Sequence, residues 1–175
     1  MDHSDHVRLL RGGIDKDGGT WADLGSGTGA FTLALADLLV TGTIYSVDRD
    51  SGARREQARS MQRFTEVHVH YLTADFTDEL GLPLLDGIVM ANSLHFVKPE
   101  RKITLLKRLR EQLQPQGRLL LVEYDVDHGN TWVPYPLSYP SWERLAAETG
   151  FASTRQLATV PSRFLGRIYS AISVR

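Results

Sequence analysis

The feature that most constrains the fold is a short apolar run, Trp21 to Leu24, that leads into the glycine-rich segment Gly25 to Gly29. Glycines at alternate positions allow a tight turn and let backbone N–H groups approach a ligand closely, because no Cβ atom is in the way. Apolar residues at helical spacing follow, from Phe31 to about Val40. We therefore expect a strand, a turn that cradles a ligand, and a helix whose positive amino-terminal end faces that ligand.

The residues of this turn fit two kinds of ligand. Gly25, Gly27 and Ala30 match the spacing of a dinucleotide-binding turn. Asp23 argues against a dinucleotide, because a carboxylate before the turn would repel a pyrophosphate and attract an ammonium group. S-adenosylmethionine (SAM) carries an ammonium group and a sulfonium and has no phosphate. The segment Asp23 to Gly29 resembles the first motif of the class I SAM-dependent methyltransferases. The remaining alternative is a structural turn in which Asp23 makes only local hydrogen bonds.

The resemblance implies that the cofactor site lies at the ends of successive strands. Asp48 follows a β-rich segment, and a carboxylate at the end of such a strand can accept hydrogen bonds from both ribose hydroxyls. Alternatively, Asp48 caps the helix expected from Ser51 to Arg63. By the same resemblance, Asp75 would accept a hydrogen bond from the adenine amino group, with Phe76 beside the ring. The alternative is a loop acid and a core aromatic. Arg49 departs from the family, which often places an adenine-packing residue there. The expected cofactor contacts are Asp23, Gly25, Ser26, Gly27, Gly29, Asp48, Arg49, Asp75, Phe76 and Asn92.

The expected strands and helices alternate along the chain. Further strands are expected at Glu66–Leu72, Leu84–Ala91, Arg118–Tyr124, Arg155–Val160 and Arg167–Val174, with helices at Pro99–Leu113 and Ser141–Gly150. Alternation predicts a parallel sheet with right-handed crossovers and helices on both faces. The resemblance implies an α/β fold, a Rossmann-like, doubly wound, mostly parallel sheet of seven strands with an antiparallel last strand. The length fits one domain, residues 1–175. A short cap helix is expected within residues 1–15, with its pattern from Val7 to Ile14.

The segment from Asn92 to Val97 is the expected catalytic region, because it resembles the loop that passes close to the methyl donor in small-molecule methyltransferases. His95 could act there as a general base, as a donor that orients the acceptor, or as a structural loop residue. Residues 125–140 form the expected substrate loop, because they follow a strand whose carboxyl end should open on the site. The candidate substrate contacts are Tyr124, His128, Trp132 and Tyr135. Alternatively, the aromatic residues cover an apolar edge.

We expect no metal site. His68 and His70 share a strand face but have no third ligand near them in the sequence. Asp125, Asp127 and His128 offer fewer oxygen ligands than hard cations usually need. The chain has no cysteine, which excludes a thiolate site, a disulfide framework and a cysteine nucleophile.

The predicted function is transfer of a methyl group from SAM to an acceptor that we expect to be a small molecule. A net charge of -1 gives no overall attraction to nucleic acid. The Asn-Pro-Pro-Tyr or Asp-Pro-Pro-Tyr motif of many nucleic-acid methyltransferases is also missing after the fourth expected strand. No apolar run is long enough for a membrane span, and the first six residues lack the pattern of a signal peptide, so we expect a cytoplasmic protein.

Two alternatives remain open. The short amino-terminal segment would leave the site open or completed by a second copy or another protein. The chain could accordingly be a non-catalytic SAM-binding subunit that works with a protein partner. The second alternative is an NAD(P)-dependent oxidoreductase, which would use the same glycines and Asp48.

Overall fold

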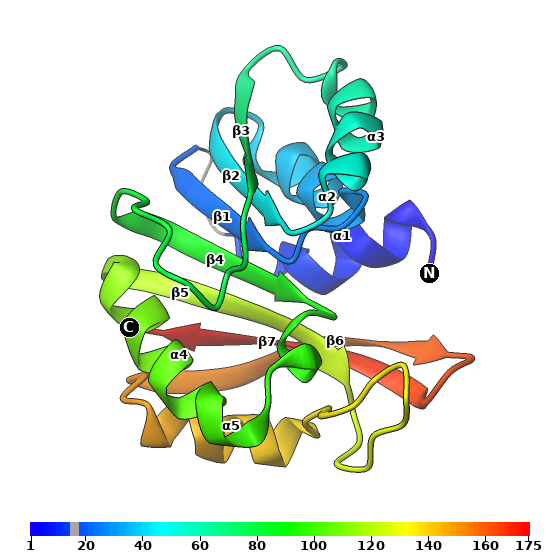
Figure 1. Ribbon diagram of the computed structural model, residues 1–175, viewed down its shortest axis with the longest axis vertical. Coiled ribbons are helices and arrows are strands. Elements are labelled where there is room, and N and C mark those ends of the chain that lie inside the picture. Colours follow the sequence, from blue (N-terminus) through cyan, green and yellow to red (C-terminus); the bar gives the residue numbers. More distant parts are fainter. Residues whose placement is uncertain (15–17) are drawn as a thin grey trace.

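The sheet has seven strands in the order β3-β2-β1-β4-β5-β7-β6 (Figure 1). The computed structural model describes residues 1–14 and 18–175, without the side chain of Arg54. The strands are β1 Thr20–Leu24, β2 Gly42–Asp48, β3 Val67–Thr73, β4 Leu85–Ala91, β5 Leu113–Tyr124, β6 Ser153–Ser162 and β7 Gly166–Val174. Every neighbouring pair is parallel except those of β7, which runs antiparallel to both β5 and β6. The predicted fold class, including the reversed last strand, is confirmed.

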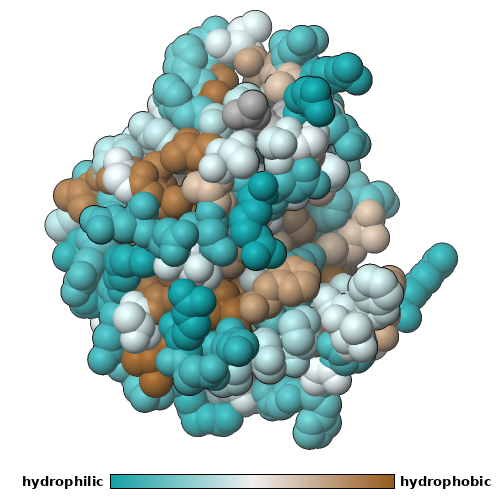
Figure 2. All heavy atoms as spheres, viewed as in Figure 1, coloured by the Kyte–Doolittle hydropathy of each residue, from teal (hydrophilic) through white to brown (hydrophobic). Residues whose placement is uncertain are grey.

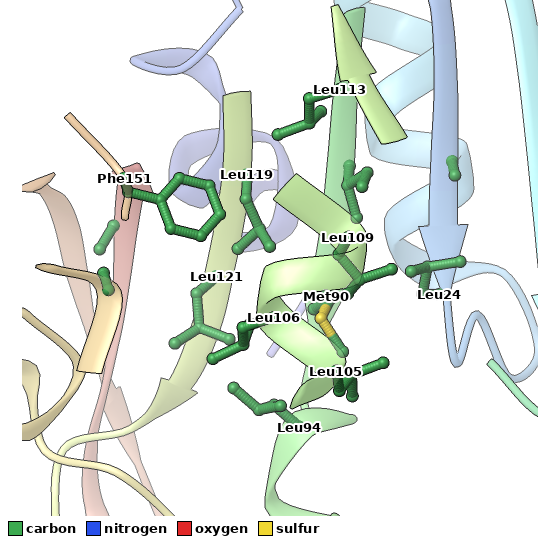
Figure 3. Packing of buried hydrophobic residues seen from close by; sticks show 14 of the residues in the cluster. Leu24, Met90, Leu94, Leu105, Leu106, Leu109, Leu113, Leu119, Leu121 and Phe151 are labelled. Atoms are coloured by element: carbon green, nitrogen blue, oxygen red, sulfur yellow. The ribbon is translucent and has the colours of Figure 1, made fainter. Parts of the chain in front are cut away.

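Helices cover both faces of the sheet (Figure 1). They are α1 His3–Arg11, α2 Ala30–Leu39, α3 Ser51–Met61, α4 Pro99–Gln112 and α5 Tyr139–Glu148, with a short 3-10 helix, η1, at Leu94–Phe96. Residues of α1, α2 and α3 belong to one apolar cluster, and residues of α4 and α5 belong to the other. Leu105, Leu106 and Leu109 of α4 form a stripe in the buried cluster that includes β5, and Figure 3 shows Leu106 beside Leu121 and Leu109 pointing toward Leu24 of β1. Because burial of one leucine contributes about 1.5–3 kcal/mol, this stripe holds α4 on the sheet.

Strand β4 contributes to both apolar clusters. Ile88 and Met90 lie in the cluster that includes α4, and Val89 lies in the cluster that includes α2. A strand that is apolar on both faces is typical of the interior of a parallel sheet. The prediction that this strand is central is confirmed, since β4 is the fourth of the seven strands in the sheet order.

The first helix differs from the expected one in its position. The side chain of Asp2 accepts a hydrogen bond from the Asp5 backbone N–H, and this cap starts α1 at His3, before the expected Val7. The helix ends at Arg11, and residue 15 of the expected cap segment lies outside the described residues. Leu9 and Leu10 are buried in the cluster that includes α2. This packing makes α1 part of the core beside α2.

Two other boundaries also differ from the predictions. Ser141 does not cap α5, because the helix begins at Tyr139 and the Ser138 side chain accepts a hydrogen bond from the Ser141 backbone N–H. The irregular segment therefore ends at residue 138, two residues earlier than expected. Strand β5 begins at Leu113, where that residue pairs with Leu85 before the register with β4 shifts. Helix α4 ends at Gln112, one residue before the expected end, and residues 115–117 belong to this extended strand.

Hydrophilic residues predominate on the face seen in Figure 2, and the apolar residues form separate areas. Among the described residues, no helix is both long enough and apolar enough to cross a membrane.

Candidate functional site

A cavity of about 390 Å³ opens at the carboxyl ends of β1, β2, β3 and β4. Parallel strands bring the residues that follow them to the same edge of the sheet, which explains why distant sequence segments meet here. The cavity is lined by six of the expected cofactor contacts, Gly25, Asp48, Arg49, Asp75, Phe76 and Asn92. It is also lined by Ser93, Phe96 and Val97 of the expected catalytic segment, and by Thr77, Lys98 and Arg101, which the sequence analysis did not single out. Their nearness to the motif residues in sequence was the available signal.

The glycine turn after β1 is shaped by packing against the rest of the protein. Gly25 has φ +79°, and a Cβ atom there would lie 2.5 Å from the Cβ of Ser93. Gly29 has φ +89°, and a Cβ atom there would lie 2.3 Å from the Cγ of Gln57. These distances are too short for non-bonded carbon atoms, so both positions require glycine for conformation and for space.

The expectation that the N–H groups of this turn face a ligand is wrong for four of them. The N–H groups of Gly25 and Ser26 donate to the Val47 carbonyl oxygen at 2.8 and 3.0 Å. The Gly27 N–H donates to Oδ2 of Asp48 at 2.7 Å, and the Gly29 N–H donates to the Ser26 carbonyl oxygen at 2.9 Å. Because β2 ends directly beside the turn, the protein itself supplies these acceptors. The turn therefore gives a ligand space beside the backbone, whereas most of its N–H groups are already bonded within the protein.

Asp23 lies beneath the turn and does not line the cavity. It is 1% exposed, and its Oδ2 accepts a 2.6 Å hydrogen bond from the Thr32 hydroxyl. Its Oδ1 is buried without a partner among the described residues. Burial raises the pKa of Asp23 to about 7, with a smaller contribution from the negative charge of Asp48. Local hydrogen bonding therefore satisfies one carboxylate oxygen only, and the other is left without a partner among the described residues.

A buried polar chain connects Asp23 to the glycine turn. The Gln57 side-chain amide donates to the Thr32 hydroxyl, and the Gln57 side-chain carbonyl lies 2.8 Å from the Ser46 hydroxyl. The Ser46 hydroxyl in turn lies 2.8 Å from the hydroxyl of Ser26. Such networks restrain the side chains that they join. Ser26 and Gly27, with Asp48, border a small hollow of about 10 Å³ beside the main cavity.

Asp48 and Asp75 present carboxylates to the cavity from neighbouring strands. Oδ1 of Asp48 accepts a 2.8 Å hydrogen bond from the Asp50 N–H. Asp50 is the residue that caps α3, which shows that the capping alternative for Asp48 is wrong. Oδ1 of Asp75 accepts hydrogen bonds from the N–H and hydroxyl of Thr77. Partial burial would raise the pKa of Asp75, but these hydrogen bonds and the nearby Arg49 guanidinium lower it below its usual value.

Asn92 ends the cavity on the β4 side. Its backbone has φ +53°, a left-handed conformation that asparagine tolerates better than most residues. Its N–H donates to the Val122 carbonyl oxygen at 2.9 Å, which fixes the turn against β5. Its side-chain Oδ1 is buried and, like Oδ1 of Asp23, has no partner among the described residues. Two buried acceptor oxygens at this edge of the sheet thus lack donors among the described residues.

His95 lies behind the cavity and does not line it. Its ring is 3% exposed, and Nδ1 lies 3.0 Å from both carboxylate oxygens of Glu123, which is fully buried at the end of β5. The ring also packs against Phe96, at 4.3 Å between centroids, and Phe96 does line the cavity. The sequence analysis missed Glu123, although a carboxylate at the end of an otherwise apolar strand was a signal.

None of the four expected substrate residues lines the cavity. Tyr124 is half-buried at the end of β5, and its ring centroid lies 6.0 Å from that of His95. Tyr135 is held by its backbone, since its N–H donates to the His95 carbonyl oxygen at 3.0 Å. His128 is exposed, and Trp132 is 74% exposed. The structure thus joins Tyr124 and Tyr135 to His95 and leaves the other two on the surface of the loop.

The acids of this loop have structural partners. Asp125 accepts a hydrogen bond from the Tyr139 N–H and pairs with Arg167. Asp127 accepts hydrogen bonds from the N–H and hydroxyl of Ser138 at the start of α5. Within the described part of the chain, no group of three or more acidic, histidine or cysteine residues is arranged to hold a metal ion. His70 stacks on Tyr45 instead, at 5.0 Å between ring centroids.

Comparison with known proteins identifies a family. A family model described as "Methyltransferase domain" matches residues 22–119, which is more than half of the chain. No curated protein sequence matches the chain.

Many solved structures share the fold. A 1,6-didemethyltoxoflavin-N1-methyltransferase from Burkholderia thailandensis, with bound 1,6-didemethyltoxoflavin and S-adenosylhomocysteine, superposes with a TM-score of 0.78 at 19% identity, over 99% of this chain and 77% of that one. The YcgJ protein of Bacillus subtilis gives a TM-score of 0.76 at 11% identity, over 99% of both chains. A putative O-methyltransferase of Nostoc punctiforme gives 0.75 at 13% identity, over 98% of this chain and 56% of that one.

Proposed function

The chain belongs to the family of SAM-dependent methyltransferases whose domain model it matches, and we propose that it transfers the methyl group of SAM to a small-molecule acceptor. The family match decides between the two enzyme classes considered from the sequence, in favour of methyl transfer over nicotinamide-dependent oxidation. The observation that carries the cofactor site is the pair of buried, unpartnered oxygens, Oδ1 of Asp23 and Oδ1 of Asn92, beside a cavity bordered by Asp48 and Asp75.

In this proposal each end of SAM has its own residues. Asp23 and Asn92 hold the amino-acid end, where an ammonium group can donate to their free oxygens. Asp48 accepts hydrogen bonds from the ribose hydroxyls. Asp75 and Phe76 bind the adenine, with the exposed Arg49 side chain at the rim. The glycine turn lets the cofactor approach the backbone closely.

SAM supplies a methyl group that is already activated by its sulfonium. The protein therefore has to align the acceptor and, where the acceptor atom carries a proton, to remove that proton. We assign the proton acceptor role to His95, because Glu123 can accept a hydrogen bond from its Nδ1 and so orient the ring. Tyr124 and Tyr135, which lie next to His95, and His128 and Trp132 on the loop are the proposed acceptor contacts.

The small-molecule acceptor is supported by one neighbour. The similar Burkholderia structure contains the small molecule 1,6-didemethyltoxoflavin together with S-adenosylhomocysteine.

Calorimetric titration of the purified chain with SAM, S-adenosylhomocysteine and NADH tests the cofactor. We expect saturable binding of the first two and none of NADH, and the reverse pattern would refute the assignment. A screen of small-molecule acceptors with the isolated chain then separates an enzyme from a SAM-binding subunit. Turnover of any acceptor would exclude the non-catalytic alternative. Binding of SAM with activity only after a protein partner is added would favour that alternative.

A further inference from the structure

A lysine is buried behind the cofactor cavity. Lys102 on α4 is 3% exposed, whereas lysine is rarely buried without a specific partner. Its Nζ donates a 2.6 Å hydrogen bond to the carbonyl oxygen of Tyr135 in the loop after β5. Burial lowers the pKa of Lys102 to about 8, although attraction to Glu123 opposes this effect. The side chain is therefore mainly charged at neutral pH, and a positive charge is held inside the protein.

The charge of Lys102 is held near a buried acid, because the residue that it binds, Tyr135, donates its N–H to the carbonyl oxygen of His95, whose ring contacts Glu123. Glu123 is fully buried, its two carboxylate oxygens lie 3.0 Å from Nδ1 of His95, and Oε1 also accepts a 2.7 Å hydrogen bond from the Tyr124 N–H. The ionisable groups that act on or near Glu123 come from four elements, namely His95 from η1, Lys102 from α4, Tyr124 from β5 and Tyr169 from β7. Burial raises the pKa of both tyrosines, so both are neutral at neutral pH.

The charges of this cluster balance only when His95 is neutral. With Lys102 positive and Glu123 negative, a neutral His95 gives a net charge of zero, the state that burial favours. The carboxylate of Glu123 then accepts a hydrogen bond from the Nδ1–H group of His95. A neutral imidazole carries only one N–H hydrogen, and in that neutral state the hydrogen is on Nδ1 and His95 Nε2 carries none. It makes no hydrogen bond to any residue that the structure describes.

Without the lysine charge the same cluster would carry a net negative charge, and burial of an unbalanced charge favours the binding of a proton. If the proton binds His95, the ring becomes doubly protonated and Nε2 carries a hydrogen. If the proton binds Glu123, the carboxylic acid donates to Nδ1, and the neutral ring then carries its own hydrogen on Nε2. Both routes give the same result, because Nε2 is protonated and can no longer accept a proton.

We propose that Lys102 is a positioning residue that, by balancing the charge of Glu123, keeps Nε2 of His95 free to accept a proton from the methyl acceptor. The proposal rests on the proposed function for the role of His95, and on the contacts of this cluster for the role of Lys102.

The same lysine also connects His95 to the acceptor loop. Tyr135 is held at both ends of its backbone, by Lys102 at its carbonyl oxygen and by the His95 carbonyl oxygen at its N–H. Phe96, the residue after His95, lines the cofactor cavity. The contacts therefore run from the cavity through Phe96 and His95 of η1 to Tyr135 in the loop, and Lys102 binds the carbonyl oxygen of Tyr135.

The experiment reads the protonation of His95 directly. The full chain is labelled with ¹⁵N-histidine, and the ring nitrogens are observed by NMR at about pH 7 without SAM or acceptor. The signal of His95 among the six histidines is assigned by its loss in His95→Gln. Lys102→Gln removes the charge but keeps a donor for Tyr135, and Lys102→Met removes both. Lys102→Arg keeps the charge, and Lys107→Met, an exposed lysine on the same helix, is the matched control.

We expect an unprotonated Nε2 in the wild type, in Lys107→Met and in Lys102→Arg, and a protonated Nε2 in whichever of Lys102→Gln and Lys102→Met is folded by circular dichroism. A protonated Nε2 in the wild type would overturn the proposal, and this result needs no variant. An unprotonated Nε2 in a folded, charge-free variant would also overturn it. SAM titration of the same samples keeps the two hypotheses separate, since failure to bind SAM would reject the proposed function without changing the NMR result.

Discussion

The hydroxyl of Thr32 donates a 2.6 Å hydrogen bond to Oδ2 of Asp23, and Oδ1 of the same carboxylate is buried with no partner among the described residues. Burial raises the pKa of Asp23 to about 7, so that in the free protein the carboxyl is partly protonated near neutral pH. A cofactor ammonium group at Oδ1 would favour the ionised form, because an opposite charge lowers the pKa of a carboxyl. Cofactor binding and proton release should therefore be coupled at this residue.

We predict that SAM affinity increases as the pH rises toward neutrality. The carboxylate must be ionised to bind the ammonium, so affinity should fall by about tenfold for each pH unit below the pKa of Asp23. Calorimetry between about pH 5.5 and pH 7.5 measures this slope, and buffers of different ionisation enthalpy measure the released proton. Asp23→Asn should bind SAM more weakly at neutral pH and lose the slope. An equal slope in wild type and variant would contradict the assignment.

We predict that the same substitution has different effects at two glycines of the turn. At Gly27, φ is +52° and no atom lies within 4 Å of the added Cβ, so alanine should cost only the left-handed backbone penalty of about 1 kcal/mol. At Gly25 the Cβ would also lie 2.5 Å from the Cβ of Ser93, and the loss should exceed about 3 kcal/mol. Urea denaturation compares the two variants.

Gly27→Ala should in addition bind SAM more weakly, if the cofactor occupies the space beside Gly27 as proposed. Calorimetry of this folded variant tests the contact separately from stability. Unchanged SAM affinity would remove Gly27 from the cofactor site.

Asp48→Ala should weaken SAM binding by about 1–3 kcal/mol, because it removes a charge-assisted hydrogen-bond acceptor. The variant also loses the acceptor for the Gly27 N–H, which lies 2.7 Å from Oδ2. Asp48→Asn separates the two effects, since its amide oxygen can still accept from Gly27 while the charge is gone. If both variants bind SAM as the wild type does, the ribose has been placed wrongly.

Lys102 should make stability depend on pH in the alkaline range. Its pKa is lowered from 10.5 to about 8 in the folded protein, so between these values the unfolded chain binds more protons. The contribution of Lys102 to the free energy of unfolding therefore rises with pH across this window, by up to about 3 kcal/mol, and is constant below it. Urea denaturation of wild type and Lys102→Met from about pH 7 to pH 10 gives the difference. We expect the wild type to gain stability relative to the variant, and a constant difference would contradict the shift.

Local patterns in the sequence predicted the alternating strands and helices, and the resemblance to class I methyltransferases supplied the seven-stranded sheet with its antiparallel last strand. The apolar run of β4 and the alternation of strands and helices determine which faces must be buried, and such periodicity is independent of distant residues. The glycine turn and the acids Asp48 and Asp75 could be located because parallel strands bring their carboxyl ends to one edge. Element ends were less predictable, as at Ser138 and Ser141, where two serines are chemically equal candidates for the cap and only backbone geometry selects one.

The tertiary structure decided what each polar group faces. Asp23 and Asn92 were both in the expected site, but only packing shows that one oxygen of each is buried and unpartnered. Glu123 and Lys102 come from β5 and α4, and no short-range pattern connects them to His95. Burial and partners arise from contacts between segments distant in sequence, and these determine the free energy of a charge. The sequence therefore determined the scaffold and the edge that carries the cofactor site, whereas the fold decided the burial and the hydrogen-bond partners of the groups placed there.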